Sequence, residues 1–272
     1  MEIKDFMLKG EGVKKPVLSK NHSGKFGTDL PDTIILHYTS GNYRAALNTF
    51  TNPRQKASAH IIIDRDGTII QLVPFDTIAW HAGRSSYGGR VGYNKYSIGI
   101  EMVNSGPLTK SGNVYRSWFG TAYNPSDVIQ AIHRNEKTPK FWHAYTEEQI
   151  QATTDLCTLL VHEMGIKHIL GHEEIAPARK SDPGPAFPLD KLRSKLLSSD
   201  RSEDGEEILP DTGRILANTL NIRELPKASG AKVAKPLKKG TKVKILDQDG
   251  KWFKVSTEVV GWVYGDYVET KA

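Results

Sequence analysis

The chain has 272 residues, of which 38% are hydrophobic and 25% are charged, and it contains one cysteine. This length predicts two domains of unequal size. The single Cys157 excludes internal disulfides and a cysteine-based zinc site. No apolar run reaches the roughly 18 residues that a membrane span needs. Residues 1–12 lack the apolar stretch of a secretory signal, as expected for a chain made in the cytoplasm or for a trimmed exported form.

The net charge of +6 lies in the C-terminal part of the chain. Residues 213–272 hold 12 Lys and Arg against 6 Asp and Glu, whereas residues 1–212 hold 25 of each kind. A basic module beside a neutral one is typical of attachment to a polyanion, and nucleic acid, anionic wall polymers and acidic lipid head groups all qualify. No base-reading motif accompanies the charge, so we do not expect a nucleic-acid binder.

The larger, N-terminal part alternates short β-branched runs with helical patterns. Asp66-Gly67 between two apolar runs is a strong hairpin signal. Thr146 and Gln149 form a capping box at the start of the longest helix, and Gly165 suits its end. These patterns predict an α/β domain with a central mixed β-sheet flanked by helices. The expected strands span residues 33–38, 60–64, 68–73 and 97–103, and the expected helices span 43–50 and 147–164.

A polar, acidic stretch without periodicity separates the two parts and predicts an exposed linker at residues 198–212. The domains are therefore expected at residues 1–197 and 213–272. Short strands between turn residues predict a small all-β barrel for the second domain. These strands are expected at residues 220–223, 242–246, 252–255 and 260–263.

Two histidines and one aspartate form a candidate metal site. His37 lies at the end of an apolar strand, and the carboxyl edge of a sheet is where α/β proteins bind ligands. His172 follows another short apolar segment, and the proline-rich loop after it carries Asp182. This ligand set suits zinc and leaves a fourth position open for water, as in catalytic sites. The ion would acidify that water and polarise a carbonyl group.

Two further charged residues fit such a site. Glu101 lies in an apolar strand, where it is either a general acid or base near the metal or an edge-strand residue facing water. Lys180 either stabilises an oxyanion or is a solvated loop lysine. The remaining histidines outside these patterns are expected to be surface or packing residues: His22, His133, His143, His162 and His168.

Five ordered blocks of the chain resemble the N-acetylmuramoyl-L-alanine amidases, a family that is related to recycling amidases, phage lysins and peptidoglycan-recognition proteins. The blocks span residues 36–39, 58–67, 80–83, 97–101 and 172–184. The resemblance implies one Zn²⁺ ion held by His37, His172 and Asp182, with Glu101 as catalytic acid or base and Lys180 stabilising the intermediate. It also implies a set of substrate-binding residues: Tyr38, His60, Trp80, His81 and Asn104.

The tail resembles bacterial SH3 (SH3b) modules, which hold enzymes to the cell wall. Trp252 and Trp262 are expected in its core, and Tyr264 is either an anchor for a ligand or a core residue. Residues 105–145 are longer than the corresponding part of a minimal family domain. This aromatic-rich insertion either walls the groove or packs over the core.

Together these features predict a monomeric hydrolase that cuts the amide bond between N-acetylmuramic acid and L-alanine. Its partners would be peptidoglycan or muropeptides, with anionic wall polymers on the basic tail. The alternative is a recognition protein that binds peptidoglycan without cutting it. A complete ligand trio favours catalysis, because non-catalytic relatives typically lack one ligand. A phage lysin, a cytoplasmic recycling enzyme and an exported remodelling enzyme all remain open.

Overall fold

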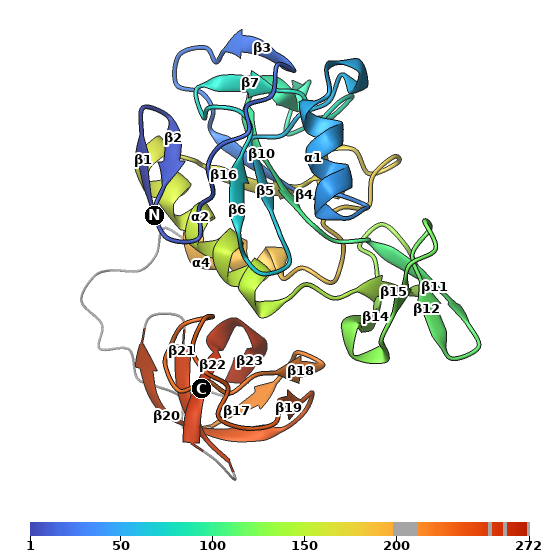
Figure 1. Ribbon diagram of the computed structural model, residues 1–272, viewed down its shortest axis with the longest axis vertical. Coiled ribbons are helices and arrows are strands. Elements are labelled where there is room, and N and C mark those ends of the chain that lie inside the picture. Colours follow the sequence, from blue (N-terminus) through green and yellow to red (C-terminus); the bar gives the residue numbers. More distant parts are fainter. Residues whose placement is uncertain (198–211, 250–251, 258–259, 271–272) are drawn as a thin grey trace. The chain divides into compact units, whose positions relative to one another are not determined.

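The computed structural model describes residues 1–197, 212–249, 252–257 and 260–270. The chain divides into a first unit, Met1–Ser198, and a second unit, Ser199–Ala272 (Figure 1). All of the expected linker except Thr212 lies outside the described residues. No helix among the described residues is long and apolar enough to cross a membrane.

A five-stranded mixed sheet forms the centre of the first unit. Its strand order is β16-β4-β10-β5-β6, in which β6 alone runs antiparallel to its neighbour. The predicted strands and the Asp-Gly hairpin are found where they were expected. The bounds are Thr33–Tyr38 (β4), Ile61–Ile63 (β5), Ile69–Gln71 (β6), Ser97–Met102 (β10) and His168–Gly171 (β16).

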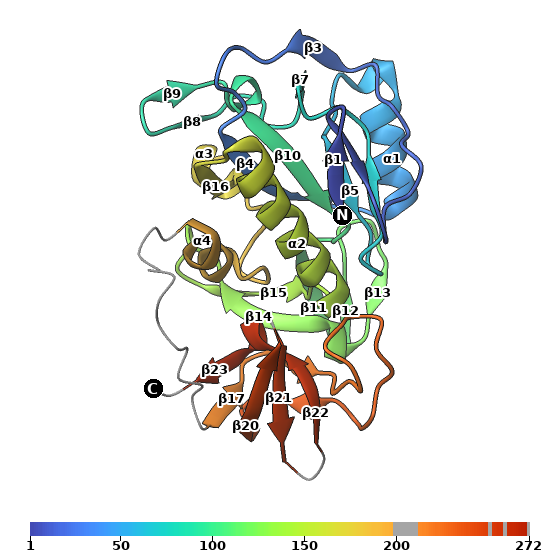
Figure 2. The same ribbon diagram turned by 90° about the vertical axis from the view of Figure 1, so that its left-hand side faces the viewer.

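Helices cover both faces of this sheet, which confirms the predicted fold class. Helix α1, Tyr43–Thr51, lies on one face, and α2, Glu147–Met164, lies with α4, Leu189–Leu197, on the other (Figure 2). The predicted capping box of α2 is present, because the Thr146 hydroxyl accepts a hydrogen bond from the Gln149 amide. Gly165 ends α2 in the left-handed conformation with φ 65°.

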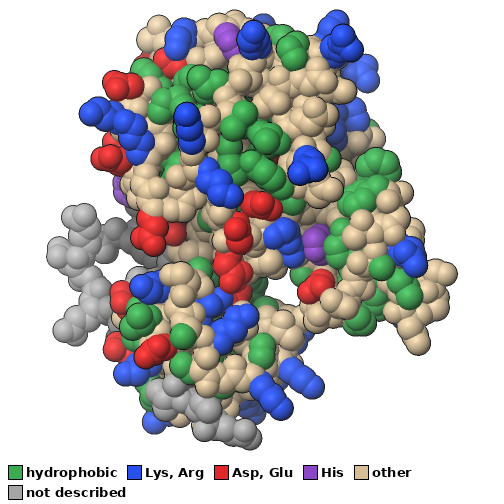
Figure 3. All heavy atoms as spheres, viewed as in Figure 1, with side chains coloured by type: hydrophobic (Ala, Val, Ile, Leu, Met, Phe, Trp, Pro, Cys, Tyr) green, Lys and Arg blue, Asp and Glu red, His purple; other side chains and the backbone are tan. Residues whose placement is uncertain are grey.

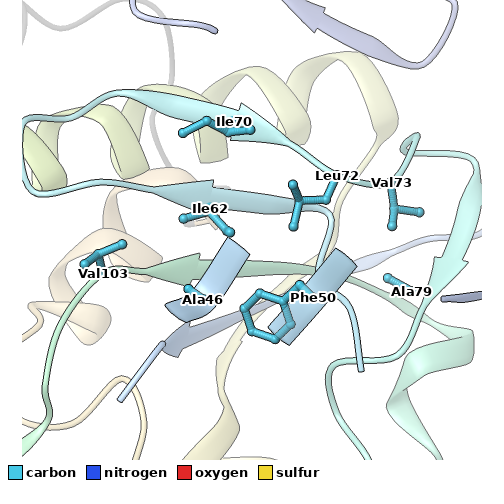
Figure 4. Packing of buried hydrophobic residues seen from close by; sticks show 8 residues of the cluster. All are labelled: Ala46, Phe50, Ile62, Ile70, Leu72, Val73, Ala79 and Val103. Carbon is cyan, nitrogen blue, oxygen red and sulfur yellow. The ribbon is translucent and has the colours of Figure 1, made fainter. Parts of the chain in front are cut away.

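The packing of α1 on the sheet shows why these apolar residues fold together. Ala46 and Phe50 on one side of α1 face Ile62 of β5 and Ile70 of β6 (Figure 4). All four side chains are buried. Burial of each large apolar side chain contributes about 1.5–3 kcal/mol. This apolar layer fixes α1 against β5 and β6.

The insertion forms a sheet of its own between β10 and α2. The strand order is β13-β12-β11-β15-β14, and the paired strands are antiparallel (Figure 1). Its aromatic residues have two fates: Trp142 is buried, whereas Trp118 is 77% exposed. The bounds are Pro107–Ser111 (β11), Val114–Arg116 (β12), Ala122–Tyr123 (β13), Val128–Ile132 (β14) and Pro139–His143 (β15).

Shorter elements complete the first unit. Three two-stranded ribbons pair β1 with β2, β3 with β7 and β8 with β9. Their bounds are Glu2–Lys4 (β1), Met7–Lys9 (β2), His22–Lys25 (β3), Thr77–Ala79 (β7), Ser86–Tyr87 (β8) and Arg90–Val91 (β9). One short helix, His172–Ile175 (α3), follows β16 directly. Single 3₁₀ turns span Pro53–Gln55, Tyr93–Lys95 and Pro125–Asp127.

The second unit is all-β among its described residues, as predicted, apart from a 3₁₀ turn at Gly265–Tyr267. Its main sheet has the order β22-β21-β20-β17-β23. The bounds are Thr212–Ile215 (β17), Lys242–Asp249 (β20), Trp252–Ser256 (β21), Val260–Tyr264 (β22) and Val268–Thr270 (β23). A second pair joins β18, Thr219–Leu220, to β19, Leu237–Lys238.

Three details of this unit refine the sequence prediction. The strand expected at residues 220–223 ends at Leu220, because Arg223 leaves it to form isolated bridges with Lys232 and Trp262. Trp252 is a core residue, as expected, whereas Trp262 is only half-buried. Tyr264 is fully buried, so it is a core residue and not an exposed anchor.

Candidate metal centre and active site

The register of three parallel strands brings the candidate residues to one edge of the central sheet. Glu101 of β10 pairs with His37 of β4. On the other side of β4, Gly171 of β16 pairs with Leu36, so His172 follows at the level of His37. Carboxyl ends of adjacent parallel strands form the ligand-binding edge of an α/β sheet. Main-chain pairing therefore brings Glu101, His37 and His172, which lie far apart in the sequence, to the same edge of the sheet.

His37, His172 and Asp182 meet at a single point. Nδ1 of His37 lies 2.9 Å from both Nδ1 of His172 and Oδ2 of Asp182. The third side of the triangle, from His172 Nδ1 to Asp182 Oδ2, is also 2.9 Å. All three residues are buried, and together they form a group able to hold a metal ion.

This donor set fits a zinc ion. Zinc bonds of about 2.0–2.1 Å in tetrahedral geometry place neighbouring ligand atoms about 3.3 Å apart. The three atoms lie slightly closer than that, so a small outward shift accommodates an ion. Two imidazole nitrogens and one carboxylate oxygen are the donors of many catalytic zinc sites, which keep a fourth position for water.

The electrostatics of the trio favour the charge states that a cation requires. Burial lowers the pKa of His37 to about 4, and the neighbouring His172 adds to this effect. Burial alone would raise the pKa of the Asp182 carboxyl. Hydrogen bonds to His172 and His37 outweigh it and hold that pKa below its usual range. A neutral His37 imidazole beside the ionised carboxylate of Asp182 is ready to bind a metal at neutral pH.

Glu101 is a buried carboxylate with an unused oxygen. The strand that carries it, β10, is the middle strand of the sheet, so the edge-strand explanation is wrong. Its Oε2 has no hydrogen-bond partner among the described residues. Burial and, to a smaller extent, the charge of Asp182 raise the pKa of Glu101 to about 8 against the opposing effect of Lys180. A buried, unpartnered group with a shifted pKa beside a metal site indicates a functional role.

Lys180 acts on the same place through its charge. It lies half-buried in the loop between His172 and Asp182, where its backbone amide donates to the carbonyl oxygen of Ala176 at 3.0 Å. Its positive charge lowers the pKa of both His37 and Glu101. The ammonium group is therefore within electrostatic reach of the trio and of the buried carboxylate.

Side chains of the insertion hold the loop that carries Asp182, and these contacts were missed by the sequence analysis. Glu173, next to His172, accepts hydrogen bonds from His133 Nε2 at 2.6 Å and from the Gly184 amide at 3.1 Å. The Tyr145 hydroxyl donates to the carbonyl oxygen of Pro183 at 2.8 Å. Gly184 has φ 73°, and a Cβ there would lie 3.0 Å from the Trp142 ring. An acidic residue directly after a candidate ligand was the available signal, but its partner is 40 residues away.

The five expected substrate-binding residues fall in different surroundings. Tyr38 is half-buried and shares a 2.6 Å hydrogen bond with Ser181, beside Asp182.

Asn104 and His60 are buried and bonded to the backbone. The Asn104 amide group donates to the carbonyl oxygen of His143 at 3.0 Å, and its oxygen accepts from the Gly106 amide at 2.8 Å. His60 Nδ1 accepts from the Gly99 amide at 3.0 Å, and Nε2 lies 2.9 Å from the carbonyl oxygen of Thr77. Both side chains thus have structural partners in the fold.

Trp80 and His81 point to different partners. The Trp80 indole donates to the Ser23 hydroxyl at 2.6 Å, within the β3–β7 region. His81 is buried, and its Nδ1 lies 3.0 Å from Nε2 of His37. His81 therefore contacts His37 of the candidate metal site, whereas the Trp80 indole bonds to Ser23 instead.

Comparisons with known proteins agree with this architecture. Residues 27–185, more than half of the chain, match the sequence profile described as N-acetylmuramoyl-L-alanine amidase. The chain belongs to this amidase family. Residues 218–269 match the bacterial SH3 domain. Both resemblances inferred from the sequence are confirmed.

Several curated relatives of this amidase-family chain are known. It is 38% identical over 144 residues to the 1,6-anhydro-N-acetylmuramyl-L-alanine amidase AmpD of Escherichia coli K12, which covers 53% of this chain and 60% of the relative. It is 34% identical over 150 residues to AmpD of Citrobacter freundii, covering 54% and 62%. The N-acetylmuramoyl-L-alanine amidase AmiD of E. coli K12 is 31% identical over 175 residues, covering 61% and 53%. The chain thus spans about three fifths of the length of the AmpD relatives.

Among solved structures, a crystal structure of a selenomethionine derivative of AmpD superposes with a TM-score of 0.51 at 27% identity. The match covers 73% of this chain and 100% of that one. The likeness supports the same fold for the first unit of this amidase-family chain.

Proposed function

We propose that this protein is a zinc-dependent N-acetylmuramoyl-L-alanine amidase that hydrolyses the amide bond between N-acetylmuramic acid and L-alanine. The observation that carries this proposal is the meeting of His37, His172 and Asp182 within 2.9 Å of one another. A buried carboxylate, Glu101, lies on the adjacent strand at the same level. The names of the AmpD and AmiD relatives support the choice of substrate.

The three ligand residues would hold one zinc ion through His37 Nδ1, His172 Nδ1 and an Asp182 oxygen. When bound, zinc acidifies water and polarises a carbonyl group. Glu101 accepts the proton of the attacking water and returns it to the L-alanine nitrogen that leaves. Its raised pKa, about 8, suits a group that both takes and gives a proton near neutral pH.

Lys180 provides a positive charge at the place where negative charge develops. Attack on the amide carbon turns the carbonyl oxygen into an oxyanion, and a cation already positioned there stabilises it. The effect of Lys180 on Glu101 and His37 supports this placement. A complete ligand trio together with these two groups favours catalysis over recognition without cleavage.

The second unit is proposed to attach the enzyme to anionic polymers of the cell wall. On β20, the exposed Lys242 and Lys244 alternate with the buried Val243 and Ile245. Arg214 of β17 pairs with Lys242 and is also exposed, so positive charges gather on one side of this sheet. Lys and Arg side chains are frequent on the visible face of this unit (Figure 3). Such a cationic surface attracts polyanions in a salt-dependent way.

A digestion experiment tests the function. Purified peptidoglycan and soluble muropeptides are incubated with the full chain, with and without a chelator, and new termini are identified by mass spectrometry. We expect free L-alanine amino termini and intact lactyl groups, which vanish with chelator and return with added zinc. Cleavage of a different bond, or cleavage unaffected by the chelator, would overturn the proposal.

A further inference from the structure

A buried dipeptide behind the metal site, His81-Ala82, contacts the far side of both histidine ligands. His81 Nδ1 lies 3.0 Å from Nε2 of His37, and the carbonyl oxygen of Ala82 lies 3.1 Å from Nε2 of His172. The His81 ring also reaches the carbonyl oxygen of Ser97 at 3.2 Å through its own Nε2. Both ligand rings therefore have a fixed partner on the side away from Asp182.

These contacts determine which nitrogen carries the proton in the rings of His81 and His37. Nε2 of His81 faces a carbonyl oxygen, which only accepts, so this nitrogen must carry the proton. Nδ1 of neutral His81 is then an acceptor, and His37 must donate to it from Nε2. The lone pair of His37 is left on Nδ1, the atom that faces His172 and Asp182. A metal needs that lone pair.

The His81 ring is held in place by close packing and by hydrogen bonds of its backbone. A Cβ on Gly99 would lie 2.4–2.8 Å from three atoms of this ring, so only glycine lets the ring lie on β10. The Asn94 side-chain oxygen accepts from the backbone amides of His81 and Ala82, at 3.0 Å and 2.7 Å. The ring position is thus held by the strand beneath it and by its own backbone.

We propose that His81 is a positioning residue that fixes the tautomer and orientation of the ligand His37, and that it does not bind substrate. This inference rests on the proposed metal site. Partners of this kind, one step away from a metal, hold the ligand ring and increase its basicity. His81 is 9% exposed and its ring nitrogens face His37 and Ser97, so it has no nitrogen left for a substrate.

Metal affinity of paired variants tests the proposal. His81→Phe keeps a ring on Gly99 but removes the acceptor, whereas His81→Asn keeps an oxygen near the position of Nδ1. Zinc affinity is measured by competition with a chromogenic chelator. We expect His81→Phe to weaken zinc binding about 10–100-fold and His81→Asn to restore most of that loss.

His143→Phe is the matched control. His143 is a similarly buried histidine, 7% exposed against 9% for His81, whose Nδ1 accepts a hydrogen bond from the Ser105 amide at 3.3 Å. We expect this variant to be less stable but to bind zinc as the wild type does. Wild-type zinc affinity in His81→Phe, or an equal loss in His143→Phe, would overturn the proposal. If the wild-type protein itself failed to bind zinc, the proposed function would fail instead.

A second measurement needs no variant. Long-range ¹H–¹⁵N spectra of the wild-type protein report the tautomer of each neutral histidine. We expect the proton on Nε2 in both His37 and His81. A proton on Nδ1 of either ring would contradict the inference, whether or not His81→Phe folds.

Discussion

The two sides of the metal centre are built in different ways. On the strand side, His37 and Glu101 occupy paired positions of β4 and β10, and main-chain register places them. On the loop side, Asp182 lies ten residues after His172, and side-chain bonds from the insertion hold the loop between and beyond them. The residues on the strand side are therefore fixed by the pairing of the strands, whereas the loop depends on particular side-chain contacts. We expect mutations to perturb the loop side more readily.

Removal of the loop ligand gives the largest expected effect. In Asp182→Ala two imidazole ligands remain and the only carboxylate ligand is lost, so zinc affinity should fall more than about 100-fold and turnover should vanish. Zinc content and amidase rate are measured together. Asp190→Ala, which removes an exposed carboxylate of α4, is the control and should match the wild type. Wild-type cleavage by Asp182→Ala would show that the ligand assignment is wrong.

The strand side is tested by separating chemistry from metal binding. Glu101→Gln keeps the shape of the side chain but cannot take a proton, so the amidase rate should fall by about 10²–10⁴-fold. Zinc content should stay at the wild-type level, because Glu101 is not among the three ligand residues. Loss of zinc in this variant would contradict the separate roles of the two sides.

Loss of the hydrogen bond between the insertion and the loop should have a smaller effect. His133→Phe keeps the ring that stacks on Trp142 but removes the 2.6 Å hydrogen bond to Glu173. The loop should loosen, and zinc affinity should drop about 10-fold. His143→Phe is the control, since the His143 ring contacts the Ser105 amide and the Tyr123 ring, neither of which belongs to the loop. Equal zinc affinity in both variants would show that the hydrogen bond from the insertion does not contribute to metal binding.

The smallest expected effect is the contribution of Glu101 to the pH dependence of stability. Its pKa rises from an ordinary 4.5 to about 8 on folding, so the folded state holds a proton that the unfolded chain releases. The contribution of Glu101 to the stability of the metal-free protein should therefore fall as pH rises from about 5 to 8. The buried His37, His60 and His143 contribute the opposite change, because burial lowers their pKa values, and they do so with or without Glu101. The stability difference between the wild type and Glu101→Gln should therefore shift against the wild type by at least about 1 kcal/mol between the two pH values. Denaturant unfolding of both metal-free proteins at about pH 5 and 8 measures this difference, and a difference that does not change with pH would refute the prediction.

Local patterns allowed much of the fold to be predicted. The capping box at Thr146 and the hairpin at Asp66-Gly67 depend on residues close in sequence, and both are found as expected. The sheet of the insertion was not predicted, because its short strands lack a clear apolar alternation, and β11 and β15 pair across the whole insertion. Strands β17 and β23 of the second unit were missed because they are short and pair with each other across that unit.

The residues of the candidate site could be predicted from the sequence, but the hydrogen bonds that hold them could not. The resemblance indicated His37, His172 and Asp182, and the structure places them together. Hydrogen bonds such as the one from His133 to Glu173 join distant segments, so no local pattern reveals them. His81 shows the same limit, because its contact with His37 joins residues that are 44 positions apart in the sequence.

The most direct test of the central claim is a crystal of the full chain grown with zinc and measured at the zinc absorption edge. We predict one anomalous peak in the first unit, about 2.0–2.2 Å from His37 Nδ1, His172 Nδ1 and an Asp182 oxygen. A peak elsewhere, or none with zinc in excess, would contradict the account.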